Sequence, residues 1–209
     1  ARAPCLAQCD WVLIQRDTGD GVLMPTHGDQ VTVHDDLSMD LTHTEALVEV
    51  KSFDGGLVFS ARDVADLQRD AWLLRTAMIA GSAQTCLDIT CVYAQQRKQF
   101  KRPLAANQAI SHKLARQCLN VASMRNSMTR SLTQDEAART YVYAAGFAGA
   151  CDLGSDVIEA AIQVHGGMGF SWDVPLHRHI RQIKTWSAQG SKAQALELVA
   201  QTVWRQAAA

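Results

Sequence analysis

The spacing of the apolar residues changes near residue 55, from the two-residue period of strands to the longer period of helices. Before that point, short apolar runs separated by turn residues predict four strands, at residues 11–14, 22–24, 30–34 and 46–50. Asp20-Gly21 stands between the first two runs and is typical of a hairpin turn. Four strands are too few for a whole barrel, and the edges of such a sheet need cover. We therefore expect a partial antiparallel β-domain over residues 1–56, within which the chain begins.

Helical periodicity follows this region. After Gly55-Gly56, apolar residues recur at helical spacing in five segments, at about residues 73–94, 110–128, 135–164, 174–185 and 191–204. The connecting segments are short and alanine is frequent, so neighbouring helices can run antiparallel and approach closely. The predicted fold class is therefore mainly α, with a four-helix-bundle C-terminal domain over residues 57–209 that follows the partial antiparallel β-domain.

The composition argues against two kinds of partner. The 209 residues hold 20 lysines and arginines against 21 aspartates and glutamates, without the basic surplus that nucleic-acid binding requires. No apolar run reaches the roughly 20 residues needed to span a bilayer, and the first residues lack the apolar core of a signal peptide. We expect a cytoplasmic protein that has no membrane span and binds no nucleic acid.

Neither the cysteines nor the histidines predict a metal site. The six cysteines are scattered, and four of them lie inside helical patterns, where reduced thiols act as small buried hydrophobes. Cys5 and Cys9 have no second pair at zinc-like spacing, and a chain with a core of its own needs no disulfide framework. His177 and His179 are two residues apart, so on a helix they face different sides.

A cationic segment lies between the first two predicted helices. It reads Arg97-Lys98-Gln99-Phe100-Lys101-Arg102-Pro103-Leu104 and is followed by Asn107-Gln108. Cations at a helix C-terminus offset the helix dipole, which accounts for one or two of the four. It does not account for the aromatic Phe100 or for the polar pair that opens the next helix. A ligand that carries both a diphosphate and a ring would use an arginine fork and an aromatic face together.

A glycine-rich segment ends the third helical pattern and reads Gln163-Val164-His165-Gly166-Gly167-Met168-Gly169-Phe170. One interpretation is a Schellman-type helix end followed by a loop. The other is a backbone that a flat ligand or a second backbone approaches closely, because glycine has no Cβ. His165 likewise fits either a functional residue or a cap at the end of the helix.

These segments, in this order, resemble the acyl-CoA dehydrogenase family. The first resemblance lies in Tyr93-Ala94, Arg97-x-Gln99-Phe100-x-x-Pro103-Leu104, Gln108-Ala109-Ile110 and Lys113-Leu114-Ala115. The second lies in Gln163-x-x-Gly166-Gly167-x-Gly169-Phe170-x-x-Asp173, followed by Arg178. Asp40-Leu41-Thr42 is similar to the end of the family's middle β-domain. The match runs over most of the chain from about residue 10.

The resemblance implies an FAD enzyme that removes two hydrogens from Cα and Cβ of an acyl-CoA thioester, where a base takes the α-proton and the flavin takes the β-hydride. The family fold has an N-terminal helical domain, a middle β-domain and a C-terminal four-helix bundle, packed as a dimer of dimers. This chain resembles the bundle and part of the middle domain. Implied partners are an acyl-CoA substrate, an electron-transfer flavoprotein or similar acceptor, and a like or unlike acyl-CoA dehydrogenase chain.

The resemblance also implies contacts with FAD, at Arg97, Phe100, Gln108, Gln163, His165, Gly166, Gly167, Gly190 and Ser191. The residues of the two motifs would contact the diphosphate and adenine side of a cofactor in a neighbouring subunit. Gly190-Ser191 matches the family's Gly-Thr, which lies near the flavin. We expect the three segments to form one wall of a flavin site that this chain does not build alone.

The family's catalytic base has no clear counterpart. Many members carry a glutamate just before Gly-Thr, where this chain has Gln189, whose amide does not ionise. Others carry it early in the first bundle helix, where the aligned position is close to Ala71. Asp70 is the remaining candidate, but a helix turns by about 100° per residue, so a carboxylate one residue away points elsewhere. The chain also departs from the family at Lys101, for glycine, and at Gln182, for an acidic residue.

Three explanations of the function remain open. The first is a subunit of an FAD-dependent acyl-CoA dehydrogenase that completes FAD sites with a partner chain. Some bacterial members, including those acting on steroid side-chain thioesters, resemble this arrangement, with two unlike subunits of which one supplies the base. The second is a catalytically inactive scaffold that keeps the bundle for oligomerisation. The third is the C-terminal part of a longer enzyme.

Overall fold

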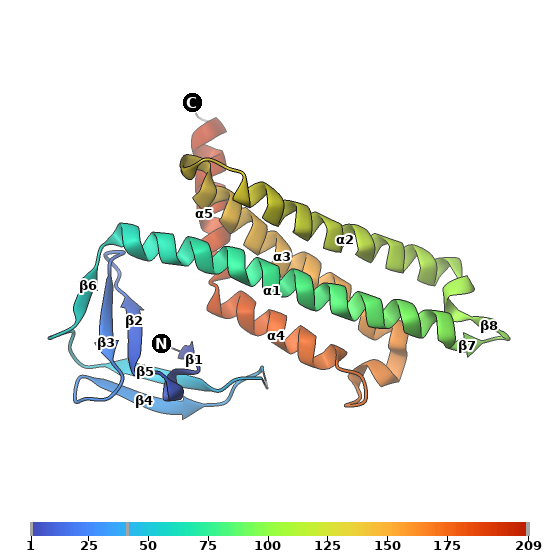
Figure 1. The fold of residues 1–209 in the computed structure, drawn as a ribbon, viewed down its shortest axis with the longest axis horizontal. Coiled ribbons are helices and arrows are strands. Elements are labelled where there is room, and N and C mark those ends of the chain that lie inside the picture. Colours follow the sequence, from blue (N-terminus) through green and yellow to red (C-terminus); the bar gives the residue numbers. More distant parts are fainter. Residues whose placement is uncertain (1, 41, 208–209) are drawn as a thin grey trace. The chain divides into compact units, whose positions relative to one another are not determined.

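A computed structural model describes residues 2–40 and 42–207 (Figure 1). The chain divides into two compact units, Ala1–Arg69 and Asp70–Ala209. The strands are β1 (Arg2–Pro4), β2 (Trp11–Gln15), β3 (Gly21–Pro25), β4 (Val31–Asp36), β5 (Glu45–Val50), β6 (Leu57–Phe59), β7 (Lys98–Gln99) and β8 (Arg102–Pro103). The helices are α1 (Ala61–Gln96), α2 (Gln108–Leu132), α3 (Glu136–His165), α4 (Leu176–Gln189) and α5 (Lys192–Ala207). The predicted mainly-α fold class is confirmed, and the domain boundary after residue 56 stays a prediction.

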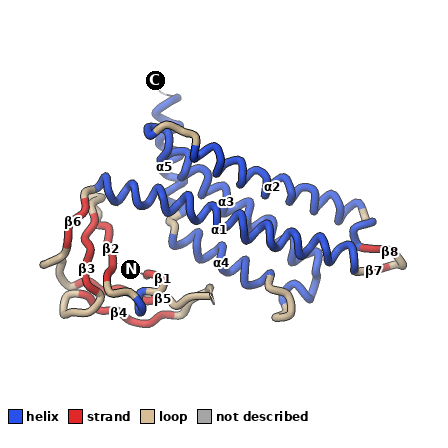
Figure 2. The backbone as a smooth tube through the Cα atoms, in the orientation of Figure 1, coloured by secondary structure: helices blue, strands red, loops and turns tan. Residues whose placement is uncertain are grey.

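The first unit holds two three-stranded antiparallel sheets, in the orders β1-β5-β4 and β2-β3-β6 (Figure 2). The four predicted strands are β2 to β5, and both sheets contribute to one small apolar core that includes Val22, Met24 and Val48. The sequence does not predict β1 and β6, because three residues are too few to show a period. The partial sheet expected from the sequence is therefore two small sheets.

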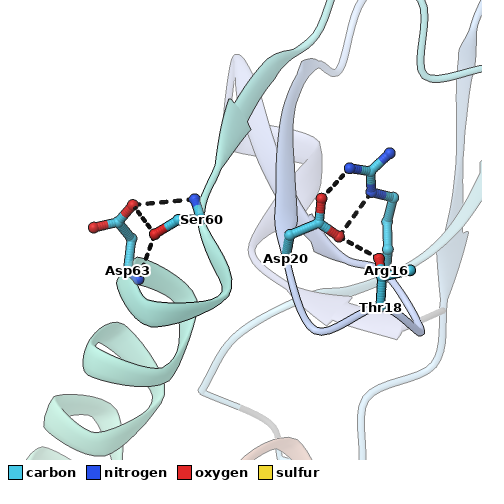
Figure 3. A network of polar contacts seen from close by, with 5 residues as sticks. All are labelled: Arg16, Thr18, Asp20, Ser60 and Asp63. Carbon is cyan, nitrogen blue, oxygen red and sulfur yellow. Dashed lines mark hydrogen bonds and ion pairs between the residues drawn. The ribbon is translucent and has the colours of Figure 1, made fainter.

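The turn between β2 and β3 is longer than the sequence indicates. It spans residues 16–20, where Gly19 has a φ of 90° and the Arg16 N–H donates to the Asp20 carbonyl at 2.8 Å. Gly21 belongs to β3, and a Cβ there would lie only 2.7 Å from Cγ2 of Val64. The predicted hairpin between β2 and β3 is present, but its predicted turn at Asp20-Gly21 is wrong, because the turn lies over residues 16–20. Hydrogen bonds from Arg16 and Thr18 to the Asp20 carboxylate hold the turn and lower the pKa of that carboxyl (Figure 3).

A capping box starts α1 (Figure 3). The Ser60 hydroxyl accepts from the Asp63 N–H at 3.2 Å, while the Asp63 carboxylate accepts from the Ser60 N–H at 3.0 Å and from its hydroxyl at 2.6 Å. These bonds lower the pKa of Asp63. The helix therefore begins at Ala61, well before the apolar stripe that predicts it from residue 73.

Asp40 and Thr42, which resemble the end of the family's middle β-domain, are hydrogen-bonded to each other before β5. Asp40 is buried, and its carboxylate accepts from the backbone N–H of Thr42 at 2.9 Å and from the hydroxyl at 2.7 Å. This is the geometry of an Asx-turn. Leu41, the middle residue of the motif, lies outside the described residues.

The second unit is a bundle in which α3 packs against α2, α4 and α5. Its core contains apolar residues from the predicted helical segments, and the largest of its fully buried side chains is Phe147 of α3. Glycine permits a close contact between α3 and α1, since a Cβ at Gly154 would lie 2.5 Å from Cγ2 of Ile79. No helix within residues 2–40 and 42–207 combines the length and apolarity that a bilayer span requires.

The six cysteines are free thiols. Cys86 and Cys151 are buried as expected, and burial raises the pKa of the Cys86 thiol to about 12 and raises that of Cys151. Cys118 is exposed, contrary to the prediction of a buried thiol, because it lies on the outer face of α2.

Candidate functional site

The segment between α1 and α2 folds as a short hairpin. α1 ends at Gln96, and β7 and β8 pair so that Gln99 lies opposite Arg102. Phe100 and Lys101 form the two-residue loop, and their φ values of 50° and 65° are those of a type I′ turn. Glycine, which the family has at position 101, adopts this conformation more readily than lysine. The loop leaves the Phe100 ring 93% exposed.

The four cations of this segment lie beyond the helix. The last turn of α1 contains no basic residue, so compensation of the helix dipole, which acts within that turn, does not explain them. Among the residues that the structure describes, none of the four forms an ion pair with a carboxylate. The base of the hairpin is closed by the Leu104 N–H, which donates to the Arg97 carbonyl at 2.9 Å. The hairpin therefore presents unpaired positive charge beside an exposed aromatic ring.

The glycine segment continues α3 as a 3₁₀ helix, η3 (Gly166–Phe170). Gly166 has a φ of 62°, and its N–H donates to the Ile162 carbonyl at the helix end. Gly169 is required by packing, because a Cβ there would lie 2.8 Å from the Ile162 carbonyl oxygen. Gly167 meets neither demand: its φ is not positive, and a Cβ there would meet no described atom within 4 Å. The helix-end interpretation thus explains Gly166 and Gly169 and leaves Gly167 unexplained.

A pocket of about 460 Å³ lies beside the glycine segment. Its lining residues are Glu159, Ile162, Gln163, Gly166, Gly167, Phe170 and Ile180. The sequence interpretation missed Glu159, Phe170 and Ile180 as lining residues. The spacing of Glu159, one helical turn before Gln163, is a signal that indicates a shared face. Ile180 comes from α4, and no local pattern places it there.

The hairpin and the glycine segment lie at the same end of the helical unit (Figure 1). The rings of Tyr93, near the end of α1, and His165, at the end of α3, stack with centroids 4.2 Å apart. Gln108 opens α2 after the short 3₁₀ helix (Leu104–Ala106) that follows the hairpin, and it is exposed, as are Arg97 and Gln163. The structure therefore places the two motifs at the same end of the helical unit, where the Tyr93–His165 stack joins them.

His165 differs from its neighbours because it is buried. Its side chain is only 5% exposed, and Nδ1 donates to the Ala161 carbonyl, 2.9 Å away. Gly166 and Gly167, which follow it directly, are exposed. The contacts of His165 are therefore made within its own chain, as expected for a residue at the end of a helix.

Gly190 and Ser191 lie elsewhere in the unit, at the turn between α4 and α5. The Gly190 carbonyl accepts from Nε1 of Trp72 at 2.7 Å, and a Cβ at Gly190 would lie 2.3 Å from Cζ of Phe147. Phe147 is about five turns before His165 in α3, or about 27 Å along the helix axis. The structure therefore does not bring Gly190 to the glycine segment. The sequence predicts that Gly190-Ser191 and the two motifs form one side of a flavin site, whereas the structure separates Gly190 from the glycine segment.

No carboxylate occupies either position that the family uses for its base. Gln189 is half-buried at the end of α4, and Ala71 is half-buried in α1. Asp70 precedes Ala71 and is exposed. Asp70 therefore stays an untested candidate for the base, which the sequence does not identify.

The two histidines of α4 have different surroundings. His177 is buried, with its ring edge-on to Trp172 at 4.7 Å, while Nδ1 of His179 lies 2.7 Å from the Ser82 hydroxyl. Burial lowers the pKa of His179. Across the described ranges, no three histidine, cysteine, aspartate or glutamate side chains are grouped to hold a metal ion.

Comparison with known proteins identifies the family. Residues 72–204 match the family profile of the acyl-CoA dehydrogenase C-terminal domain. Because this match covers more than half of the chain, the chain belongs to the acyl-CoA dehydrogenase family. The resemblance drawn from the two motifs is confirmed.

Relatives and solved structures agree with this assignment. Acyl-CoA dehydrogenase IpdE2 of Mycolicibacterium smegmatis is 30% identical over 162 residues, which cover 75% of this chain and 48% of IpdE2. The ChsE4-ChsE5 complex from Mycobacterium tuberculosis is 25% identical with a TM-score of 0.80, over 97% of this chain and 58% of that chain. A variant of the Tcur3481-Tcur3483 steroid ACAD shares the fold, at 21% identity and a TM-score of 0.83, over 95% of this chain and 56% of that chain. The chain spans about half the length of the proteins that it matches.

Proposed function

We propose that this chain binds the diphosphate and adenine side of an FAD whose flavin serves a neighbouring chain, within an FAD-dependent acyl-CoA dehydrogenase. The observation that carries the proposal is that Arg97, Phe100 and Gln108 are exposed at the same end of the bundle as the open backbone of Gly167. Contacts within the described chain do not explain the exposed ring, the unpaired cations or the glycine at position 167.

The chemistry of these residues fits the cofactor. A diphosphate is an anion, and an arginine fork binds it through charge-assisted hydrogen bonds. The exposed Phe100 ring offers an apolar face, and Gly167 allows a ligand to approach the backbone because no Cβ stands in the way. When bound, FAD supplies the acceptor for the hydride removed from the acyl-CoA. The part of this chain is to bind and orient one side of the cofactor.

The remaining parts of the reaction are assigned outside this chain. Because Gln189 and Ala71 stand where the family places its base, we assign the base to a partner chain or to another part of the same enzyme. The likeness to ChsE4-ChsE5, a complex by its name, supports an assembly of like or unlike chains. An acyl-CoA thioester is the proposed substrate, and an electron-transfer flavoprotein or similar protein is the proposed acceptor.

The test is the FAD affinity of the purified natural assembly, with Arg97→Ala compared with Arg130→Ala. Arg130 is a matched control, since it is also exposed but lies at the opposite end of α2. Loss of a charge-assisted contact costs about 1.5–3 kcal/mol, so Arg97→Ala should weaken FAD binding about 10- to 100-fold. Arg130→Ala should leave it unchanged.

A catalytically inactive scaffold is the second candidate, and the missing carboxylate at positions 71 and 189 favours it. An assembly without flavin absorbance would support the scaffold. So would equal FAD affinity in the Arg97→Ala and Arg130→Ala variants. Retention of flavin with a selective loss in Arg97→Ala would exclude it.

A further inference from the structure

The stacked rings of Tyr93 and His165 join two segments that are far apart in the sequence. Tyr93 lies one turn before the end of α1, and His165 is the last residue of α3. Their planes are 19° apart with centroids 4.2 Å apart, and His165 is 5% exposed. Two flat rings stacked face to face, with His165 buried and Tyr93 partly buried against the core, leave little freedom for either helix end to shift.

Tyr93 and His165 are each connected to one segment of the proposed cofactor site. On the α1 side, the Tyr93 carbonyl accepts from the Arg97 N–H at 2.8 Å, and the Arg97 carbonyl accepts from the Leu104 N–H at 2.9 Å. The stack is therefore continuous, through two hydrogen bonds, with the base of the hairpin that carries Phe100.

On the α3 side, His165 directly precedes Gly166 and Gly167. Its Nδ1–H donates to the Ala161 carbonyl at 2.9 Å, which fixes the orientation of the ring relative to the last turn of α3. A carbonyl oxygen only accepts, so the proton must sit on Nδ1. The imidazole is thus held from two sides, by Tyr93 across the stack and by its own helix.

We propose that Tyr93 and His165 form a positioning pair, which sets the spacing between the hairpin and the glycine segment without either ring touching the cofactor. The proposal rests on the proposed function, because it assigns to these two rings the preorganisation of that site. It also replaces the direct FAD contact that the family resemblance implies for His165. A site built from two segments needs them held to within about 0.5 Å to bind well, and this pair is a described contact that spans the two.

The test uses variants that separate the flat ring from its polar atoms. His165→Phe keeps a ring for the stack and removes the N–H, whereas His165→Ala removes both. Tyr93→Phe and Tyr93→Leu form the matched pair on the other helix. In the natural assembly, His165→Ala and Tyr93→Leu should each weaken FAD binding about tenfold, because the two segments lose their fixed spacing. His165→Phe and Tyr93→Phe should stay within about twofold of the wild type.

Two further readouts separate positioning from direct contact. The Tyr93→Leu/His165→Ala double variant should lose little more than either single variant, since both disrupt one contact. Hydrogen exchange should quicken at residues 97–104 and 166–170 in His165→Ala and stay at the wild-type rate in His165→Phe.

The opposite pattern would overturn the proposal. If His165→Phe weakened FAD binding as much as His165→Ala while exchange stayed unchanged, His165 would be a direct polar contact to the cofactor. If the wild-type assembly held no FAD, the proposed function would fail, but exchange would still test the pair. Unchanged exchange in His165→Ala would then reject it, and faster exchange in both segments would support it.

Discussion

A methyl group at Gly190 would lie 2.3 Å from the Phe147 ring, whereas a methyl group at Gly167 would meet no described atom within 4 Å. Gly190 is buried, with its carbonyl bonded to Trp72, and Gly167 is exposed. The family motifs assign both glycines to FAD, yet packing within the chain already explains Gly190. A glycine that the chain's own packing does not explain is stronger support for a ligand than one that it does.

The largest expected effect comes from placing the same methyl group at each glycine. Gly190→Ala should lower the free energy of unfolding by about 2 kcal/mol or more, because Phe147 is fully buried and has no room to move. Gly167→Ala should stay within about 0.5 kcal/mol of the wild type. Chemical denaturation of the assembly measures the stability of both variants, and flavin titration measures FAD binding.

The comparison predicts opposite profiles for the two variants. Gly167→Ala should weaken FAD binding without a loss of stability, whereas the main effect of Gly190→Ala should be a loss of stability. A stable Gly190→Ala variant with reduced FAD binding would mean that Gly190 also serves the cofactor.

The second prediction tests the hydrogen bond that Trp72 donates to the buried Gly190 carbonyl. Trp72→Phe keeps a ring beside Phe147, with which Trp72 stacks at 6.5 Å, but removes the donor to the Gly190 carbonyl. Loss of this hydrogen bond should cost about 0.5–1.5 kcal/mol of unfolding free energy. Thermal or chemical unfolding of the variant measures this cost. A loss below about 0.3 kcal/mol would show that this hydrogen bond contributes little.

The helices could be predicted from the sequence because their apolar residues recur over many turns, as Leu87, Cys91 and Ala94 do. The same holds for the location of the two cofactor motifs, which are continuous in the sequence. The Tyr93–His165 stack could not be predicted, because it joins residues that only the tertiary packing of α1 and α3 brings together. Nor could the separation of Gly190 from the glycine segment, since it follows from the length of α3 between Phe147 and His165.

The smallest expected effect concerns pH and a contact between α1 and α4. Burial lowers the pKa of His179 below its ordinary value of 6.5, so the unfolded chain binds the proton more readily than the folded one. The stability that neutral His179 contributes is complete above pH 6.5 and is lost as the pH falls from 6.5 through the lower folded pKa. Unfolding free energies of wild type and His179→Gln, measured from about pH 8 to about pH 5, should show a smaller acid loss in the variant. Parallel curves would contradict this assignment.

The most direct test of the account is a density map of the natural assembly with FAD bound. The account predicts density for the diphosphate and adenine beside Arg97, Phe100 and Gly167 of this chain, with the flavin ring in the active site of a neighbouring chain. His165 should remain stacked on Tyr93, away from the cofactor. FAD bound elsewhere, with the β7–β8 hairpin facing solvent, would contradict it.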